Sequence, residues 1–136
     1  MGKLPEGWED YSNVGTVVEG TNFIAFKVPL SFNAKWNLSK LKKSVPELTG
    51  IIDLTATKKY YKPETCKALG IKYRKIAVPG GGKVPGESFV QEFYDAVADL
   101  SSDDDGGLIG VHCTHGLNRT GYMVCRSVGF PIKCTG

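Results

Sequence analysis

Short segments with apolar or β-branched side chains, separated by turn residues, mark the strands expected in this chain. Four such segments, at 23–28, 51–54, 73–78 and 108–111, have the length of strands. The first is followed by Pro29, which cannot donate to a strand ladder. The runs at 51–54 and 108–111 are short and mostly apolar, which is typical of strands buried on both faces of a parallel sheet.

Helical periodicity is clearest after residue 86. Apolar side chains recur there at helical spacing, at Phe89, Phe93, Val97 and Leu100. Ser88 and Gln91 have the spacing of a capping box, which predicts that the helix starts at Ser88. A shorter helix is expected at 38–45 with Asn37 as its N-cap, and the apolar residues 122–125 favour a buried helix.

The remaining segments are expected to be loops. Residues 1–22 are predicted to be a loop-rich lead-in, 79–86 is rich in glycine and proline, and 101–107 is a polar, acidic connector. Strands that alternate with helices predict an α/β domain with a mostly parallel central sheet flanked by helices. At 136 residues, without an internal linker, we expect a single domain over 1–136.

Composition excludes several classes of protein. The fractions of hydrophobic (41%) and charged (23%) residues fit an ordinary globular domain rather than a disordered or membrane-embedded chain. No apolar run approaches a membrane span, and no signal-peptide core is present, so no membrane partner is expected. The four cysteines show no paired framework, which favours a reducing, intracellular compartment.

The candidate functional loop is His-Cys-Thr-His-Gly-Leu-Asn-Arg-Thr-Gly at 112–121. It joins an expected strand to an expected helix, and ligands bind at the carboxyl ends of strands in such folds. No residue from Thr114 to Arg119 is proline, so all six backbone N–H groups can bind an anion at the helix N-terminus. The same field favours thiolate at Cys113, and Arg119 can hold two phosphate oxygens at once. This pattern predicts a nucleophile directed into a phosphate site.

Two alternatives carry no such chemistry. Cys113 can be a buried structural cysteine beside a surface arginine, because free cysteine is often a core residue. A zinc site would draw on His112, Cys113, His115 and Cys125. Their spacing lacks the paired ligand pattern of zinc sites, so no metal is expected.

The sequence His-Cys-x-x-Gly-x-x-Arg-Thr at 112–120 resembles the signature of the cysteine-dependent phosphatases, specifically of their dual-specificity branch. The longer stretch 112–126 is similar to the RNA 5′-triphosphatase members of that branch, which include the triphosphatase domain of animal capping enzymes. The resemblance extends to 8–11, 23–29, 51–55 and 60–63. It therefore covers most of the chain up to about Arg126.

The resemblance implies two-step phosphoryl transfer without a metal or other cofactor. Cys113 attacks a terminal phosphorus, Arg119 and the loop N–H groups stabilise the transition state, and Thr120 helps the sulfur to leave in the second step. The expected phosphate-binding residues are Thr114, His115, Gly116, Leu117, Asn118 and Arg119. His112 is expected to support the loop, which is compatible with its being a core imidazole.

The chain lacks the general acid that phosphatases acting on proteins usually carry some tens of residues before the cysteine. Residues 71–94 contain no aspartate, and Glu87 is the candidate there. Asp53 lies within an expected strand and Asp95 lies in mid-helix, so both are poor alternatives. A tyrosine leaving group, with a pKa of about 10, needs protonation, whereas a diphosphate ionises near pH ~6 and departs as an anion. The missing general acid therefore favours RNA with a 5′ triphosphate as the substrate.

Basic residues gather in three clusters, although the net charge is only +3. The clusters are Lys40, Lys42 and Lys43; Lys58, Lys59 and Lys62; and Lys72, Arg74 and Lys75. Clusters of this kind suit RNA, and any single one can also be ordinary solvated surface. The middle cluster follows a strand that should end near the phosphate loop. The expected RNA contacts are Lys58, Lys59, Tyr60, Lys62 and Arg126, and Tyr60 and Tyr61 can equally be half-buried core.

The resemblance also implies a nuclear, monomeric protein whose other partners are phosphoproteins or ribonucleoprotein components. Residues 127–136 depart from the family, because Gly129 and Pro131 end the helix early and later helices are missing. We therefore expect a phosphatase domain truncated after about residue 126. Two further functions stay open: a protein phosphatase acting on phosphotyrosine or phosphoserine, and an inactive variant that binds RNA or phosphate.

Overall fold

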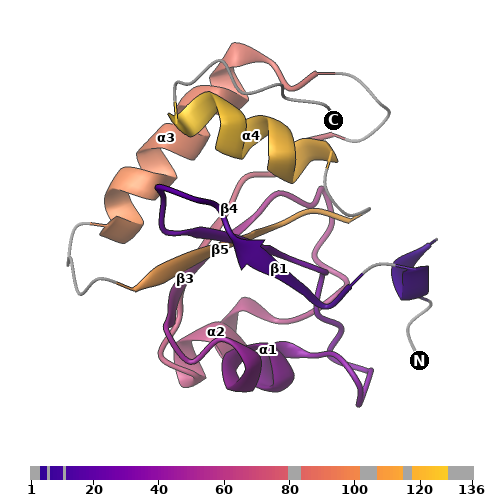
Figure 1. The fold of residues 1–136 in the computed structure, drawn as a ribbon. Helices are drawn as coiled ribbons and strands as arrows, with labels where there is room; N and C mark the ends of the chain where they lie inside the picture. The colour runs from indigo at the N-terminus through magenta and orange to yellow at the C-terminus, as the bar shows by residue number, and fades with distance from the viewer. Residues whose placement is uncertain are drawn as a thin grey trace.

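Five strands form one sheet in the order β1-β2-β5-β3-β4 (Figure 1). The computed structural model describes residues 4–5, 7–10, 12–79, 84–101, 107–114 and 118–128. The strands are β1 (Val14–Val17), β2 (Phe23–Phe26), β3 (Leu48–Asp53), β4 (Lys72–Lys75) and β5 (Leu108–His112). β2, β5, β3 and β4 run parallel, and β1 joins β2 in the antiparallel sense. The predicted α/β class with a mostly parallel sheet is confirmed.

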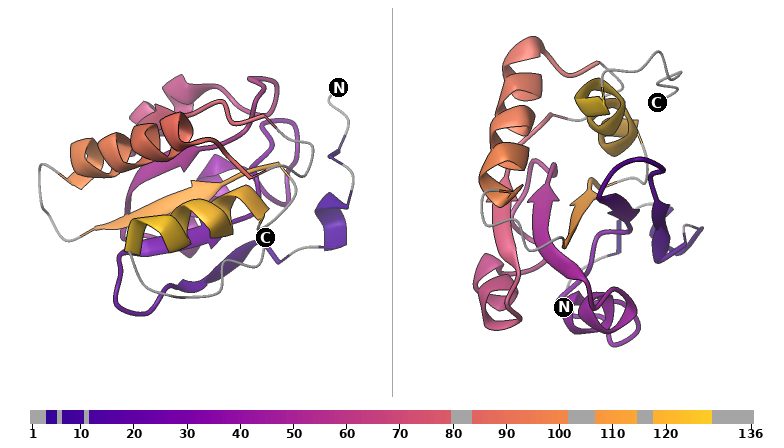
Figure 2. Two further views of the ribbon diagram at one scale, coloured as in Figure 1. Left: turned by 90° about the horizontal axis from the view of Figure 1, so that it is seen from above. Right: turned by 60° about the vertical axis from the view of Figure 1, so that its left-hand side comes forward.

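Helices cover both faces of this sheet (Figures 1 and 2). α1 (Leu38–Ser44) and α2 (Pro63–Ala68) lie on one face, and α3 (Glu87–Ser101) and α4 (Asn118–Val128) lie on the other. A short 3-10 helix, η1 (Trp8–Asp10), precedes the sheet. None of the helices described is long and apolar enough to cross a membrane.

The core has two halves, because successive strand residues point to opposite faces. Ile51 of β3 packs with Trp36 and Leu41 on the side of α1 and α2. The next residue, Ile52, packs with Phe93 and Met123 on the side of α3 and α4. Each of these side chains is at most 2% exposed. Burying one contributes about 1.5–3 kcal/mol relative to leaving it in water, so both helical layers are held firmly to the sheet.

Gly110 lets the central strand pack closely against its neighbours. A Cβ atom at this position would overlap the Phe26 ring on β2 and touch the Leu48 side chain on β3. Glycine therefore permits the close approach that keeps β5 between these two strands. β5 leads directly into the candidate functional loop, so this packing fixes where the loop begins.

The N-terminal segment is more ordered than the sequence suggested. The Trp8 indole N–H donates to the Val28 carbonyl at 2.9 Å, and β1 adds an edge strand beside β2. Most side chains of β1 are exposed, so the strand carries no apolar alternation that periodicity could detect. α2 was also missed, because six residues that start with Pro63 are too few to show a helical pattern.

Helix boundaries agree in part with the sequence. The Asn37 side chain accepts a hydrogen bond from the Lys40 N–H at 3.0 Å, which confirms the predicted N-cap. The capping box at Ser88 is wrong, because α3 already begins at Glu87. Its first amides instead donate to the Gly86 carbonyl, from Phe89 and Val90. α4 includes the predicted 122–125 and extends in both directions.

Candidate active site

Cys113 lies where β5 leaves the middle of the sheet. The last residue of β5, His112, is in register with Asp53 at the end of β3. Cys113 follows directly and is 2% exposed, and Thr114 after it is half-buried. The structure thus places the predicted nucleophile at the carboxyl edge of the central strand, where α/β folds bind their ligands.

α4 follows the candidate loop and presents its N-terminus to it. The helix begins at Asn118 and runs for 11 residues. Its first amides have no partners within the helix, so they and the helix dipole favour an anion at this end. The predicted phosphate-binding residues His115, Gly116 and Leu117 lie outside the described residues, as does the side chain of Asn118.

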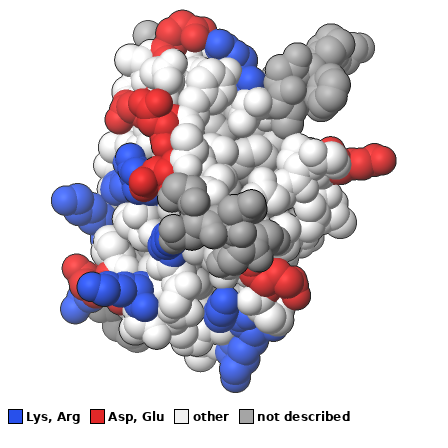
Figure 3. Space-filling view, turned by 90° about the vertical axis from the view of Figure 1, so that its left-hand side faces the viewer, with Lys and Arg blue, Asp and Glu red and all other residues white. Residues whose placement is uncertain are grey.

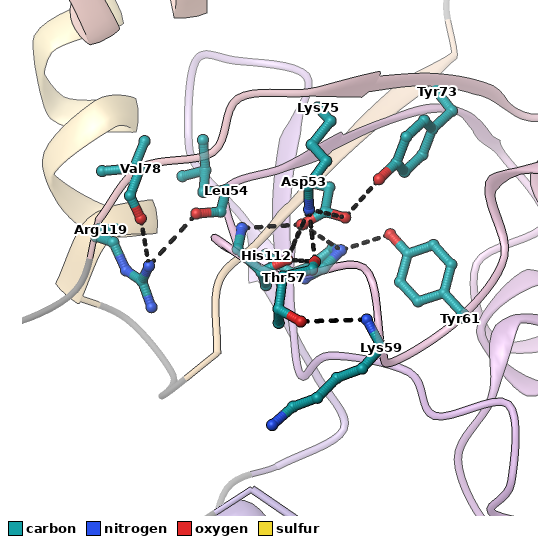
Figure 4. A network of polar contacts seen from close by, with 11 residues as sticks. Asp53, Leu54, Thr57, Lys59, Tyr61, Tyr73, Lys75, Val78, His112 and Arg119 are labelled. Carbon is teal, nitrogen blue, oxygen red and sulfur yellow. Dashed lines mark hydrogen bonds and ion pairs between the residues drawn. The ribbon is translucent and has the colours of Figure 1, made fainter. Parts of the chain in front are cut away.

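Arg119, in the first turn of α4, reaches the ends of two strands (Figure 4). Its Nη1 donates to the Val78 carbonyl at 2.7 Å and lies 3.4 Å from the Leu54 carbonyl. These carbonyls lie just beyond β4 and β3, so they hold the guanidinium at the edge of the sheet where Cys113 is placed. A guanidinium has five N–H donors in a planar fork, and those beyond Nη1 can serve phosphate oxygens.

Thr120 is buried beside Arg119, with 2% of its surface exposed. Its hydroxyl makes no hydrogen bond to any residue in the described part of the chain. The predicted bond from Thr120 to the Cys113 sulfur is therefore not formed in this structure. Its role in the second reaction step stays a prediction.

His112 is fully buried directly before Cys113. Its Nε2 lies 2.6 Å from the Tyr61 hydroxyl oxygen, and its ring packs against Phe26 with 5.1 Å between centroids. Burial lowers the pKa of His112 to about 4, although the Asp53 carboxylate acts in the opposite direction. The ring is thus neutral at neutral pH. This placement fits both a loop support and a core imidazole.

Asp53 is enclosed by donors. Its Oδ1 accepts from the Thr55 N–H at 2.9 Å and the Thr55 hydroxyl at 2.7 Å. Its Oδ2 accepts from the Tyr73 hydroxyl at 2.5 Å and from Lys75 Nζ at 3.2 Å. Burial raises the pKa of Asp53, but the nearby His112 ring and the hydrogen bonds from Tyr73 and Thr55 lower it below the ordinary value. An ionised, enclosed carboxylate cannot act as a general acid.

The other candidate acids are no better placed. Glu87 forms two hydrogen bonds with Arg126, at 2.7 and 2.9 Å, and the pKa of Glu87 is lowered chiefly by that contact. Asp95 is exposed on α3 and accepts from Gln91 at 3.0 Å. Glu92, in the same helix, is exposed as well. Glu87 is thus bound by Arg126, and Asp95 and Glu92 lie exposed on α3.

The middle basic cluster lies between β3 and α2, beyond the carboxyl end of β3. Lys58, Lys59 and Lys62 are all exposed. The Lys59 amide donates to the Thr57 hydroxyl at 3.3 Å, while its side chain extends away from the Asp53 network (Figure 4). Its ammonium lies 5.5 Å from the centroid of the Tyr60 ring. These three lysines are thus available to an anionic partner.

The two other predicted RNA contacts, Tyr60 and Arg126, are buried or already bound within the protein. Tyr60 is 6% exposed, so little of its ring is available for stacking. Arg126 binds Glu87 and also donates to the Tyr122 hydroxyl at 2.9 Å. In the third cluster, Arg74 pairs with Asp99 at 2.5 Å and Lys75 binds Asp53.

Charges of both signs are interspersed on the side where β5 begins (Figure 3). This is the side turned away from the candidate site, because Cys113 lies at the other end of β5. No large area of one charge sign is visible there among the residues drawn as described.

The partners of Asp53 and His112 were not identified from the sequence as a network. A buried strand that ends in an aspartate needs donors around it, which is the signal that could have found them. Register supplies two of them, because Asp53 faces Lys75 on β4 and His112 on β5. Tyr61 and Tyr73 complete the network, although their positions in the sequence are equally compatible with ordinary core residues.

No metal centre is evident in the described ranges. They contain no group of three or more His, Cys, Asp and Glu side chains that could hold an ion. Cys66, Cys113 and Cys125 are free thiols. His115, which the zinc alternative also requires, lies outside the described residues.

Curated relatives of this chain carry phosphatase names. A tyrosine-protein phosphatase of Autographa californica nuclear polyhedrosis virus is 44% identical over 132 residues, which cover 90% of this chain and 78% of that protein. The RNA/RNP complex-1-interacting phosphatase of Homo sapiens is 44% identical, and its homolog in Caenorhabditis elegans is 41% identical. The aligned part spans 41% of the human protein and 60% of the nematode protein. No family model matches the chain.

Solved structures with the same fold are more distant in sequence. PTPMT1 in complex with PI(5)P aligns with a TM-score of 0.64 at 14% identity, over 86% of this chain and 72% of that one. The core catalytic domain of the PP-IP phosphatase SIW14 from S. cerevisiae aligns with a TM-score of 0.55 at 22% identity, over 83% and 63%. At these identities the likeness establishes the phosphatase fold alone.

Proposed function

Because this chain belongs to the phosphatase family of the baculovirus tyrosine-protein phosphatase and the RNA/RNP complex-1-interacting phosphatases, we propose that it hydrolyses the terminal phosphate at the 5′-triphosphate end of RNA. The chain is a phosphatase of the protein-tyrosine or dual-specificity type. The choice of RNA as substrate is the proposal, and the names of the RNA/RNP complex-1-interacting relatives support it.

The observation that carries this choice is the state of the acids around the site. Asp53 is ionised and enclosed, and Glu87 is held by Arg126. The loop residues 79–86 contain no acid. A phosphoanhydride tolerates this arrangement, because its diphosphate leaving group needs no proton, whereas tyrosine or serine does.

The proposed reaction has two steps. The Cys113 thiolate forms a bond to the terminal phosphorus while the bond from phosphorus to the bridging oxygen breaks, and diphosphate-ended RNA leaves as an anion. Water then attacks the cysteinyl-phosphate, inorganic phosphate departs, and the thiolate is restored with loss of one proton to solvent. Arg119 stabilises charge on the equatorial oxygens in both steps. Thr120 is assigned the donor to the sulfur as it leaves.

The proposal includes a contact between RNA and the exposed lysines beyond β3. Lys58, Lys59 and Lys62 extend from a segment that starts at the same edge of the sheet as Cys113. They would neutralise RNA phosphates behind the reacting end and release counterions, so binding should weaken as salt rises. Charge neutralisation at the reacting phosphate is assigned to Arg119 and the loop, so activity should persist after dialysis against a chelator.

The test is phosphate release from triphosphate-ended RNA by the purified 136-residue chain, with Cys113→Ser as the blank. We expect inorganic phosphate and diphosphate-ended RNA from the wild type alone. Equal release by the two proteins would overturn the cysteine mechanism.

A second candidate is a protein phosphatase, favoured by the name of the baculovirus relative. It requires a faster reaction with phosphotyrosine peptide than with RNA. Binding of RNA without turnover of any of these substrates would instead identify an inactive binding variant.

A further inference from the structure

The segment 55–59 carries two of the three exposed lysines beyond β3, and it makes no backbone–backbone hydrogen bond to any described residue. Among these residues, its hydrogen-bond partner from outside the segment and β3 is Lys75, at the end of β4 (Figure 4). We propose that Lys75 is a positioning residue, whose ammonium holds this segment in the conformation in which Lys58 and Lys59 bind RNA. This inference rests on the proposed RNA substrate, and it assigns Lys75 no contact with that substrate.

Lys75 directs all three ammonium donors at one short stretch of chain. Its Nζ donates to the Thr57 carbonyl at 2.8 Å, to the Thr55 hydroxyl at 2.9 Å and to Asp53 Oδ2 at 3.2 Å. An ammonium has three donors and no acceptor, so these contacts leave none for a phosphate. The Lys75 side chain is only 18% exposed. Lys75 is therefore placed to hold the segment rather than to bind a ligand.

The Thr55 hydroxyl belongs to the same network and is almost fully buried, with 1% of the residue exposed. While it accepts from Lys75, it is positioned to donate to Asp53 Oδ1 at 2.7 Å and to the Thr57 carbonyl at 3.0 Å. The Thr55 amide also donates to Asp53 Oδ1, at 2.9 Å. These side-chain contacts fold the first half of the segment back onto the end of β3, in place of backbone hydrogen bonds.

The two flanks of the segment are held without the ammonium. On one side, the Leu54 amide donates to a carbonyl of β5 at 2.9 Å. On the other, the Ser31 amide donates to the carbonyl of Tyr60, at 2.8 Å. Loss of Lys75 should therefore free the middle of the segment and leave Leu54 in place beside Arg119. The expected defect lies in RNA binding rather than at the reacting phosphate.

Ordering of the segment before RNA arrives should strengthen binding. A protein whose binding conformation is only partly populated has an apparent Kd that is raised by the inverse of that population. A segment with few backbone hydrogen bonds opens readily once its remaining contacts are removed. Lys75→Met keeps an unbranched side chain and removes the three donors. We expect it to lower the population of the binding conformation to about one tenth, which raises the Kd for RNA about tenfold.

The test is a double-mutant cycle on the Kd for triphosphate-ended RNA, measured by fluorescence anisotropy. The full 136-residue chain carries Cys113→Ser, so that no substrate is consumed. Lys75→Met should raise the Kd about tenfold in this chain, but less than about twofold when Lys58→Ala and Lys59→Ala are also present. The matched control is Lys72→Met, which removes an exposed lysine from the same strand and should change the Kd less than about twofold.

Equal increases in both backgrounds would show that Lys75 acts on RNA independently of the two lysines, and would overturn the proposal. A less stable protein with an unchanged Kd would also overturn it, because Lys75 would then be purely structural. If Lys75→Met fails to fold, Thr55→Val and Thr55→Ser decide, since only serine keeps the hydroxyl that accepts from Lys75. Thr55→Val should bind RNA about threefold more weakly than Thr55→Ser, and equal affinities would contradict the proposal.

The proposed reaction is tested separately from this role of Lys75. Phosphate release is measured with the wild-type chain, whereas the cycle measures binding alone. Coupling between Lys75 and the two lysines without any phosphate release would support the positioning role and overturn the proposed reaction. Phosphate release without coupling would overturn the positioning role alone. Absence of RNA binding by the Cys113→Ser chain would overturn both.

Discussion

Arg119 Nη1 lies 2.7 Å from the Val78 carbonyl, which ties the first turn of α4 to the chain just beyond β4. A side chain that is oriented before the phosphate arrives needs little rearrangement in the transition state, and such preorganised charge is a large source of catalysis. The contact also uses only part of the guanidinium. Its remaining donors can bind the transferring phosphoryl group as a fork.

Arg119→Lys should lower kcat/KM for the best substrate by about 10²-fold or more, because an ammonium cannot hold the strand carbonyls and two phosphate oxygens together. Steady-state kinetics measure the loss. The matched control is Arg74→Lys, which changes an arginine paired with Asp99 and away from the described site. Near-normal turnover by Arg119→Lys would mean that bidentate stabilisation is the wrong account.

Cys113→Ser should abolish turnover and keep the affinity for inorganic phosphate within about threefold. The serine hydroxyl stays protonated near neutral pH, while the helix N-terminus and Arg119 are unchanged. Phosphate affinity is measured by calorimetry. Cys125→Ser, on α4, serves as the control and should retain turnover. Residual activity in Cys113→Ser equal to that of wild type would exclude the cysteine as the nucleophile.

Glu87→Gln should change kcat/KM by less than about threefold, because Glu87 is held by Arg126 in a form that gives up no proton. The pH profile of the variant is the decisive measurement. If Glu87 is the general acid, the substitution should cost about 10²-fold and remove the high-pH limb of the wild-type profile. That outcome would reopen the protein-phosphatase function.

The fold and the place of Cys113 at the end of a central strand were accessible from the sequence for a physical reason. Strands such as β5 are apolar on both faces, and the His-Cys-x-x-Gly-x-x-Arg-Thr spacing admits few alternatives. β1 escaped detection because an exposed edge strand has no buried face to leave an apolar alternation. The contact between the Tyr61 hydroxyl and His112 was also not predicted, because a tyrosine with a buried ring cannot be told from an ordinary core residue until its hydroxyl partner is known.

The stability of the fold should fall in mild acid because of His112. Its pKa in the folded chain is about 4, below the value of 6.5 for an unperturbed histidine. The unfolded chain therefore binds a proton first as pH falls, and stability that is present above pH 6.5 is lost toward pH 4. The expected loss between pH 7 and pH 5 is at most about 2 kcal/mol.

Urea unfolding at the two pH values measures this loss. His112→Asn should flatten the pH dependence, while His115→Gln should retain it. A slope that disappears with His115→Gln would assign the effect to the wrong histidine. Asp53 acts in the same direction at lower pH, because its pKa is also lowered and its stabilising contacts are lost on protonation.

The most direct test of the proposed function is kcat/KM for triphosphate-ended RNA, a phosphotyrosine peptide and a phosphoserine peptide, each measured at two salt concentrations with Cys113→Ser as the blank. Without a general acid, the rate should follow leaving-group pKa, so RNA should react fastest and phosphoserine slowest. Of the three substrates, only RNA should show a kcat/KM that falls steeply as salt rises, because Lys58, Lys59 and Lys62 bind its backbone phosphates. A phosphotyrosine peptide that reacts faster than RNA at both salt concentrations would contradict the account.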